Sequence, residues 1–175
     1  MTTNDWLPAL IEFAGNWEQY LEKLYEIFKQ DFISDPPTFN NRCFALKKHP
    51  VYKGKAATFW HLISEGSVEE ERTPDLRRCE RICWPRSIID TGHLHGIKIW
   101  KNLRQGKTRL LLALEDFSYV VILDERVEYY LLWTAYPVEH AHQRRKLENE
   151  WQNYSKSRHR HPLDDGAVTP STHGR

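Results

Sequence analysis

The chain contains side chains whose types suit proton transfer and the binding of an anionic group. His61 lies in an apolar segment, TFWHLIS, and its imidazole is a candidate general acid or base. A histidine in such surroundings is equally often a buried residue with its own hydrogen-bond partner. Thr134 and Tyr136 supply two hydroxyl groups where a hydrophobic segment ends, before Pro137. These hydroxyls could position a phosphate group or a ribose 2′-OH.

Basic side chains that could bind a phosphate are concentrated in one segment. They are Arg72, Arg77, Arg78 and Arg81. The last three recur at spacings of three and four on a predicted helix. Guanidinium groups bind phosphate oxygens in pairs, so this ridge suits an RNA backbone. The alternative is ion pairing with the acidic run 69–71 and with Glu80. Lys98 and Lys101 offer further positive charge.

RNA cleavage of this kind needs no protein nucleophile, because the 2′-OH attacks the adjacent phosphate. One group takes the 2′-OH proton, another protonates the leaving 5′-oxygen, and cations stabilise the phosphorane. His61 is the first candidate for proton transfer, and Glu71 is a second candidate base. Most of the aromatic residues should lie in the core, but one of several could stack on an unpaired base: Trp60, Trp84, Trp100, Trp133 or Tyr136.

Metal chemistry is the weaker alternative. Cys79 and Cys83, with His93 and His95 following, could hold a tetrahedral zinc ion, although this spacing matches no common zinc pattern. Cysteines spaced in this way on a helix also suit a buried core position. The usual nucleotide-binding, serine-hydrolase and zincin motifs do not occur. We therefore expect no metal and no cofactor.

The segment 97–136 positions the two hydroxyls. Short polar breaks divide it into four runs rich in Val, Ile, Leu, Tyr and Trp, which predicts strands at about 97–102, 107–114, 117–123 and 127–134. The connections are short enough for hairpins. The sequence therefore predicts an α+β fold in which a four-stranded antiparallel β-meander packs against helices.

The predicted helices surround this meander. An amphipathic helix covers about 16–32, with Asn16 as its N-cap. Thr73-Pro74-Asp75 predicts a helix start, and that helix should end before Trp84. Segment 56–64 fits a helix or a strand, and 138–152 a charged helix. We expect an N-terminal helical extension (1–37), an α+β domain (38–152) and a disordered polar tail (153–175).

Composition narrows the possible partners and the compartment. The 175 residues include 25 Lys and Arg against 24 Asp and Glu, a formal net charge of +1. The chain therefore lacks an overall basic field, and only a local patch could attract RNA. No early run is long and apolar enough for a signal peptide or membrane span, so we expect a cytoplasmic protein without membrane contact. Three cysteines predict no disulfide framework.

Three segments give the chain a resemblance to a known superfamily. They are TFWHLIS with His61, RTPDLRRCERICW, and YYLLWTAYPVE with Thr134 and Tyr136. Together with helices ahead of a four-stranded meander, they resemble the BECR superfamily of metal-independent RNases, which includes barnase, EndoU, colicin nucleases and RelE toxins. The likeness is to phage- and toxin-associated members and covers about 40–152.

The resemblance implies a metal-independent endoribonuclease of toxin type. His61 would act as acid or base, Arg78 and Arg81 would bind the phosphate, and Thr134 and Tyr136 would orient it. Arg72, Arg77, Lys98 and Lys101 would bind the RNA substrate. Such a toxin implies an antitoxin or immunity protein as partner. Two alternatives stay open: a non-catalytic module that binds protein or RNA, and a zinc-supported structural protein.

Overall fold

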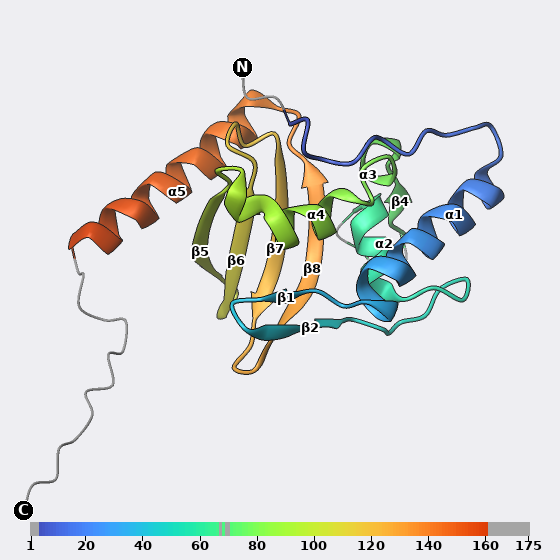
Figure 1. Cartoon of the computed structure of the whole chain (residues 1–175), viewed down its shortest axis with the longest axis horizontal. Coiled ribbons are helices and arrows are strands. Elements are labelled where there is room, and N and C mark those ends of the chain that lie inside the picture. The colour runs from blue at the N-terminus through green and yellow to red at the C-terminus, as the bar shows by residue number, and fades with distance from the viewer. Residues whose placement is uncertain (1–3, 67, 69–70, 161–175) are drawn as a thin grey trace, which may run out of the picture.

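The computed structural model describes residues 4–160, except 67, 69 and 70. Helices and strands alternate through the first half, and the second half is a run of strands closed by a long helix (Figure 1). In chain order the elements are α1 (Trp17–Lys29), a π-helical turn (Gln30–Ser34), β1 (Thr38–Phe39), β2 (Arg42–Leu46), α2 (Ala57–Ile63), β3 (Ser64–Glu65), β4 (Thr73–Pro74), α3 (Leu76–Cys79), α4 (Trp84–Thr91), a 3-10 turn (Gly92–Leu94), β5 (Lys98–Arg104), β6 (Lys107–Ala113), β7 (Tyr119–Glu125), β8 (Tyr129–Pro137) and α5 (Ala141–Arg160).

The main sheet has six strands in the order β1-β2-β8-β7-β6-β5. Strands β5 to β8 pair antiparallel with their sequence neighbours, whereas β2 runs parallel to β8. The predicted α+β class is confirmed. The sheet is nevertheless mixed and larger than the predicted four-stranded antiparallel meander. Strands β1 and β2 form a short antiparallel hairpin with each other, and β2 joins the sheet through β8, which lies far from it in the sequence.

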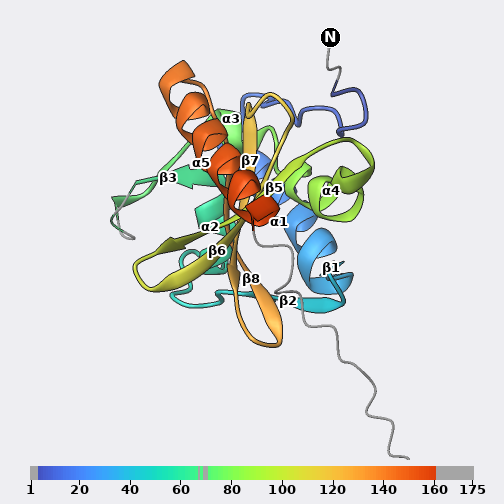
Figure 2. The same cartoon turned by 90° about the vertical axis from the view of Figure 1, so that its left-hand side faces the viewer.

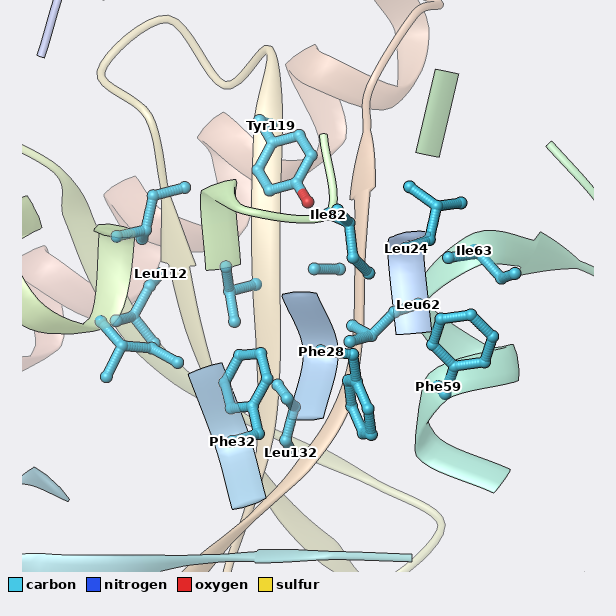
Figure 3. Close-up of a cluster of buried hydrophobic side chains, with 14 of the residues drawn as sticks. Leu24, Phe28, Phe32, Phe59, Leu62, Ile63, Ile82, Leu112, Tyr119 and Leu132 are labelled. Carbon is cyan, nitrogen blue, oxygen red and sulfur yellow. The ribbon is translucent and has the colours of Figure 1, made fainter. Parts of the chain in front are cut away.

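One face of this sheet carries the larger core, which brings together side chains from both halves of the chain (Figure 3). Helix α1 contributes Leu24 and Phe28, helix α2 contributes Phe59, and strands β6 and β8 contribute Leu112 and Leu132. Each of these side chains is at most 1% exposed. Burying one such side chain stabilises the fold by about 1.5–3 kcal/mol. The N-terminal helix is therefore built into the same core as the sheet.

The opposite face carries a smaller core beneath α5. Trp100, Leu111, Phe117 and Val138 meet Leu147 of the helix there. Helix α5 lies beside β5, at the side of the sheet away from α1 and α2 (Figures 1 and 2). It continues to Arg160, so residues 153–160 are helical where a disordered tail was predicted. The remaining tail, 161–175, lies outside the described residues.

The helix expected between Thr73 and Trp84 is shorter than predicted, and a second helix lies beyond its expected end. Asp75, rather than Thr73, is the N-cap of α3, and its carboxylate accepts a hydrogen bond from the backbone N–H of Arg77. Helix α3 is only one turn, and α4 begins at Trp84 with Pro85 in its first turn. Proline fits the first turn of a helix because the N–H it lacks has no helical partner there. Pro85 therefore lies near a helix start and not beyond a helix end.

In the part of the chain that the structure describes, no helix combines the length and the apolar character needed to cross a membrane.

Candidate active site

The candidate site is built around the C-terminal end of helix α2. This seven-residue helix places Phe59, Leu62 and Ile63 in the larger core. The chain turns into extended backbone at Ser64, which pairs with Pro74 in the small β3–β4 sheet. The last carbonyl groups of a helix have no partner within it, so they must accept hydrogen bonds from elsewhere.

Donors from three other segments meet these carbonyl groups. The hydroxyl of Thr134, in β8, donates to the carbonyl oxygen of His61 at 2.9 Å. The backbone N–H of Asp75 donates to the carbonyl oxygen of Ile63 at 2.9 Å. Two arginines donate to the carbonyl oxygen of Ser64. The end of α2 thus gathers side chains that are far apart in the sequence.

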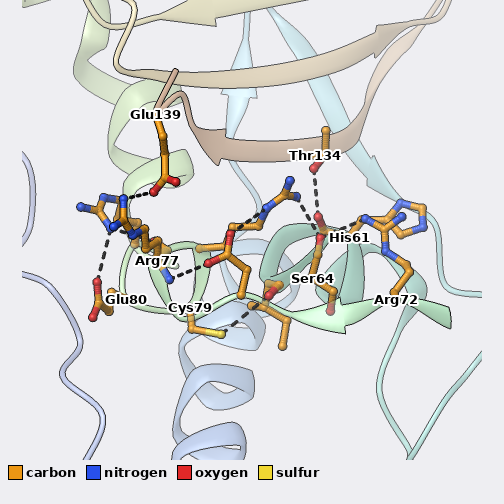
Figure 4. A network of polar contacts seen from close by, with 12 residues as sticks. His61, Ser64, Arg72, Arg77, Cys79, Glu80, Thr134 and Glu139 are labelled. Carbon is orange, nitrogen blue, oxygen red and sulfur yellow. Dashed lines mark hydrogen bonds and ion pairs between the residues drawn. The ribbon is translucent and has the colours of Figure 1, made fainter. Parts of the chain in front are cut away.

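The two arginines on Ser64 are Arg72 and Arg78, whose nitrogens lie 3.0 and 2.9 Å from that oxygen. Arg72 also donates to the carbonyl oxygen of Gly66 at 2.8 Å. The Nε atom of Arg78 lies 3.6 Å from the carboxylate of Asp75. One carbonyl oxygen therefore holds two guanidinium groups close together, which concentrates positive charge beside α2. Figure 4 shows His61, Ser64, Arg72 and Thr134 together in this network.

Tyr136 completes this group from the far end of β8. The guanidinium carbon of Arg78 lies 5.1 Å from the centre of its ring, within reach of a cation–π interaction. Burial raises the pKa of the Tyr136 hydroxyl, and the positive charges of Arg104 and Arg78 oppose that rise. The hydroxyl is therefore protonated at neutral pH and is able to donate a hydrogen bond.

His61 itself lies almost out of contact with solvent, with 4% of its surface exposed. Its imidazole ring meets the indole of Trp133 edge to face, with ring centres 5.3 Å apart. The guanidinium carbon of Arg109 lies 4.3 Å from the centre of the same indole. Trp133 therefore links the imidazole to a polar cluster on the sheet.

That polar cluster consists of Arg109, Asp124 and Arg126, none of which was predicted from the sequence as a site residue. Asp124 is 1% exposed, and one of its oxygens lies 2.5 Å from Nε of Arg109, its cross-strand partner. Burial lowers the pKa of Arg109, while the charge of Asp124 opposes this change. A signal was available in the sequence, because Asp124 follows the apolar run of β7 and Arg109 precedes that of β6.

Two of the predicted arginines lie apart from the gathered group. Arg77 forms an ion pair with Glu139, and its side chain is 64% exposed. Arg81 donates to the carbonyl oxygen of Arg77 and stacks over Trp84. In Figure 4, Arg77, Glu80 and Glu139 lie at the opposite end of the network from His61. The single ridge expected from helical spacing does not form, because α3 is only four residues long.

The two predicted lysines also lie away from the gathered group. Both are on β5, which is separated from β8 by two strands, or about 14 Å at the usual strand spacing. Lys98 lies over the ring of Trp151 in α5. Lys101 pairs with Glu125 at 2.9 Å, on the opposite face of the sheet from Lys98. Glu71, the second candidate base, is exposed.

The cysteines and histidines considered for zinc have other surroundings. Cys79 is buried, and its thiol lies 3.7 Å from the carbonyl oxygen of Ile63. His95 stacks on Trp6, with ring centres 4.3 Å apart. Over residues 4–160, as far as they are described, no group of three or more Cys, His, Asp or Glu is arranged to hold a metal ion.

Comparison of the chain with protein-family models, with curated proteins and with solved structures gave no match. The function must therefore be inferred from the side chains of the site. Its side chains are an imidazole from α2, two guanidinium groups from the residue before β4 and from α3, and two hydroxyls from β8. This set can bind a phosphate group and move a proton beside it.

Proposed function

We propose that the protein is a metal-independent endoribonuclease of toxin type that cleaves RNA through attack of the 2′-OH. The observation that carries the proposal is the meeting of Arg72, Arg78 and Thr134 on the backbone carbonyl oxygens of His61 and Ser64, at the end of the helix that carries the imidazole. This arrangement supplies a proton-transfer group and charge for the phosphorane within one short helix end. The resemblance to the BECR RNases rests on segments that contain these same residues, and it agrees with this function.

Each residue has a defined role in this proposal. His61 takes the 2′-OH proton or protonates the leaving 5′-oxygen. Arg78 binds a non-bridging phosphate oxygen, and among the described residues its Nη2 atom has no hydrogen-bond partner. Arg72 adds positive charge, and Tyr136 donates its hydroxyl to the phosphate or the 2′-OH. Thr134 is a positioning residue, because its hydroxyl holds the backbone of His61.

The test is cleavage of a mixed-sequence, fluorescently labelled RNA in EDTA. We expect wild type to produce fragments that end in 2′,3′-cyclic phosphate or 3′-phosphate. His61→Ala and Arg78→Ala should each lower the cleavage rate by about a hundredfold or more. Unchanged cleavage by His61→Ala would remove the imidazole from the mechanism. The absence of any cleavage by wild type would count against the enzyme itself.

The chain provides a matched control for the arginine variants. Arg77 lies on the same short helix as Arg78, but its side chain is exposed and pairs with Glu139. Arg77→Ala removes the same charge from the protein without changing the gathered group. Its cleavage rate should stay within about threefold of wild type. An equal loss in both variants would indicate general attraction of RNA rather than a role at the phosphate.

A toxin of this type needs a neutralising partner, which is an antitoxin or immunity protein. Such a partner would cover the positive charge of Arg72 and Arg78 with acidic side chains. Toxicity is tested by induced expression in bacteria. Arrest of growth by wild type and normal growth with His61→Ala would support the toxin role.

A second candidate is a non-catalytic module that binds protein or RNA. Two observations favour it: His61 is only 4% exposed, and Arg72 and Arg78 already satisfy the carbonyl oxygen of Ser64. In that case these side chains would fix the end of α2 and perform no chemistry. Binding of RNA without cleavage in the assay above would favour this candidate.

A further inference from the structure

A pocket of about 310 Å³ lies next to the candidate active site, on the side of α2 that carries Trp60. Its walls come from α1, the loop before α2, α2 itself and β4. The residues that give it chemical character are Trp17, Tyr52, Lys53, Trp60, Arg72 and Pro74. Its volume is at the lower end of the range for small-molecule sites, about 300–1,000 Å³.

The aromatic walls of this pocket are held in place before any ligand binds. The indole N–H of Trp60 donates to the carbonyl oxygen of Tyr52 at 3.1 Å. The rings of the same two residues meet edge to face, with centres 5.3 Å apart. Fixed aromatic surfaces bind a flat ring well, because little side-chain freedom is lost on binding.

The loop that carries Tyr52 is anchored to the body of the protein. Tyr52 and Lys55 exchange two backbone hydrogen bonds, of 3.1 and 2.9 Å. Lys55 is 6% exposed, and its ammonium group lies 2.5 Å from the carboxylate of Glu22 in α1. The hydroxyl oxygen of Thr58 also accepts a 2.7 Å hydrogen bond from the backbone N–H of Lys47. The pocket is therefore a built feature of the fold.

The mouth of the pocket is both apolar and positively charged. Val51 and Tyr52 line it, yet they are 55% and 57% exposed. Lys53 and Arg72 are the charged residues among its described lining, which includes no carboxylate. A ligand with a flat aromatic ring and an anionic group would cover the exposed apolar surface and meet both cations. A nucleotide has this chemistry.

Arg72 connects the pocket to the candidate active site. Its guanidinium binds the carbonyl oxygens of Ser64 and Gly66 at the end of α2, and it also lines the pocket. Trp60, in the pocket wall, directly precedes His61 in the sequence. A nucleotide base in the pocket would therefore place its phosphate towards Arg72, at the end of α2.

We propose that this pocket, the Trp60 pocket, binds one unpaired base of single-stranded RNA beside the phosphate that is cleaved. The proposal rests on the endoribonuclease function above and names the part of the substrate that the enzyme reads. Stacking against Trp60 and Tyr52 holds the base, while Lys53 and Arg72 attract its phosphate. The pocket thereby selects the position of cleavage within the RNA.

Binding of nucleotides tests the pocket independently of cleavage. Calorimetric titration of the full chain in EDTA would use AMP, GMP, CMP and UMP, with ribose 5-phosphate as a probe without a base. We expect at least one nucleotide to bind more tightly than ribose 5-phosphate. Tyr52→Ser should lower the affinity for that nucleotide by about tenfold, because one stacking surface is lost. Lys53→Gln should lower the affinity for the nucleotide and the affinity for ribose 5-phosphate to the same extent.

Tyr129→Ser is the matched control, because Tyr129 is a tyrosine that is 40% exposed at the start of β8 and does not line the pocket. Its nucleotide affinity should equal that of wild type. Equal affinity of wild type for nucleotides and ribose 5-phosphate, or no effect of Tyr52→Ser, would overturn the pocket proposal. Thermal unfolding of each variant checks that both serine variants are folded.

Cleavage data separate this proposal from the function on which it rests. If nucleotides bind in a way that depends on Tyr52 but wild type does not cleave RNA, the pocket proposal is kept and the endoribonuclease proposal is rejected. RNA cleavage with the same base preference in wild type and Tyr52→Ser would keep the endoribonuclease and reject the pocket. Cleavage with a base preference that Tyr52→Ser lowers by about tenfold would support both.

Discussion

The hydroxyl of Thr134 donates a 2.9 Å hydrogen bond to the carbonyl oxygen of His61, and this bond joins strand β8 to helix α2. Parallel pairing of β2 with β8 ends at Leu46 and Leu132. Beyond that point, α2 rather than a strand packs against β8. The side-chain hydrogen bond of Thr134 thus holds β8 to its neighbour where the backbone hydrogen bonds to β2 end. The same contact fixes the backbone from which the imidazole projects.

Thr134→Val should measure how much this contact contributes to the stability of the fold. Valine keeps the shape of threonine but leaves the carbonyl oxygen of His61 without its side-chain donor, at a cost of about 1–3 kcal/mol in the free energy of unfolding. Thr134→Ser retains the hydroxyl and should lose less than half of that. Urea denaturation measures both. Equal stability of the valine variant and wild type would show that another donor satisfies this oxygen.

Arg78→Met tests the convergence of two arginines on Ser64. The Arg78 side chain is 15% exposed, and its hydrogen bond to the carbonyl oxygen of Ser64 is charge-assisted. Loss of such a bond costs about 1.5–3 kcal/mol. Arg77→Met, which removes an exposed ion pair, should cost less than about 1 kcal/mol. Urea denaturation of the two variants gives the comparison, and a similar loss in both would contradict the assigned contacts.

The sequence predicted the parts of this arrangement that depend on local patterns. Alternating apolar residues and short polar breaks placed the four consecutive strands to within a few residues of their ends. Helical spacing placed α1, and Asn16 caps it as expected. His61, Thr134, Arg72 and Arg78 were all named as candidates from residue type. These signals are local, so they can be recognised without knowledge of tertiary contacts.

What the sequence could not provide depends on contacts between distant segments. The parallel pairing of β2 with β8 joins residues that are more than 80 positions apart. Helical spacing grouped Arg78 with Arg77 and Arg81, but the single turn of α3 directs them to different partners. The burial of the ion pair between Arg109 and Asp124 could not be predicted for the same reason, because it depends on which segments cover β6 and β7.

The ion pair of Arg109 and Asp124 should dominate the stability of its face of the sheet. Asp124 is 1% exposed, and the Arg109 side chain is 11% exposed. Asp124→Ala would leave a largely buried guanidinium without its partner, at a cost of about 3–5 kcal/mol. Denaturant titration measures this loss of stability.

A double variant provides the control for that loss. Arg109→Met combined with Asp124→Leu removes both charges and should recover at least half of the stability lost in Asp124→Ala, because no charge is left unpaired. If the double variant is no more stable than Asp124→Ala, lost packing rather than the unpaired charge causes the destabilisation. The double variant also tests whether the stack of Arg109 on Trp133 influences cleavage through His61.

Alkylation of the cysteines tests the packing of α3 against the end of α2. Burial raises the pKa of the Cys79 thiol to about 12, and the negative charge of Asp75 adds to this rise. At pH 8 roughly one Cys79 thiol in ten thousand is then ionised, and only the thiolate reacts with iodoacetamide. Cys43 is exposed and provides the internal comparison. Peptide mass spectrometry should find Cys43 alkylated and Cys79 unmodified.

The direction of the pH dependence follows from the raised pKa. Because the folded protein holds the Cys79 proton more tightly than the unfolded chain does, raising the pH above the ordinary thiol pKa of 9.0 favours unfolding. Alkylation of Cys79 should therefore stay slow at pH 8 and rise steeply above pH 9, through both ionisation and opening of the site. Cys79→Ala should lose less stability between pH 8 and pH 10 than wild type does. Rapid alkylation of Cys79 at pH 8 would mean that α3 separates from Ile63 in solution, and the convergence of Arg72 and Arg78 would then be lost with it.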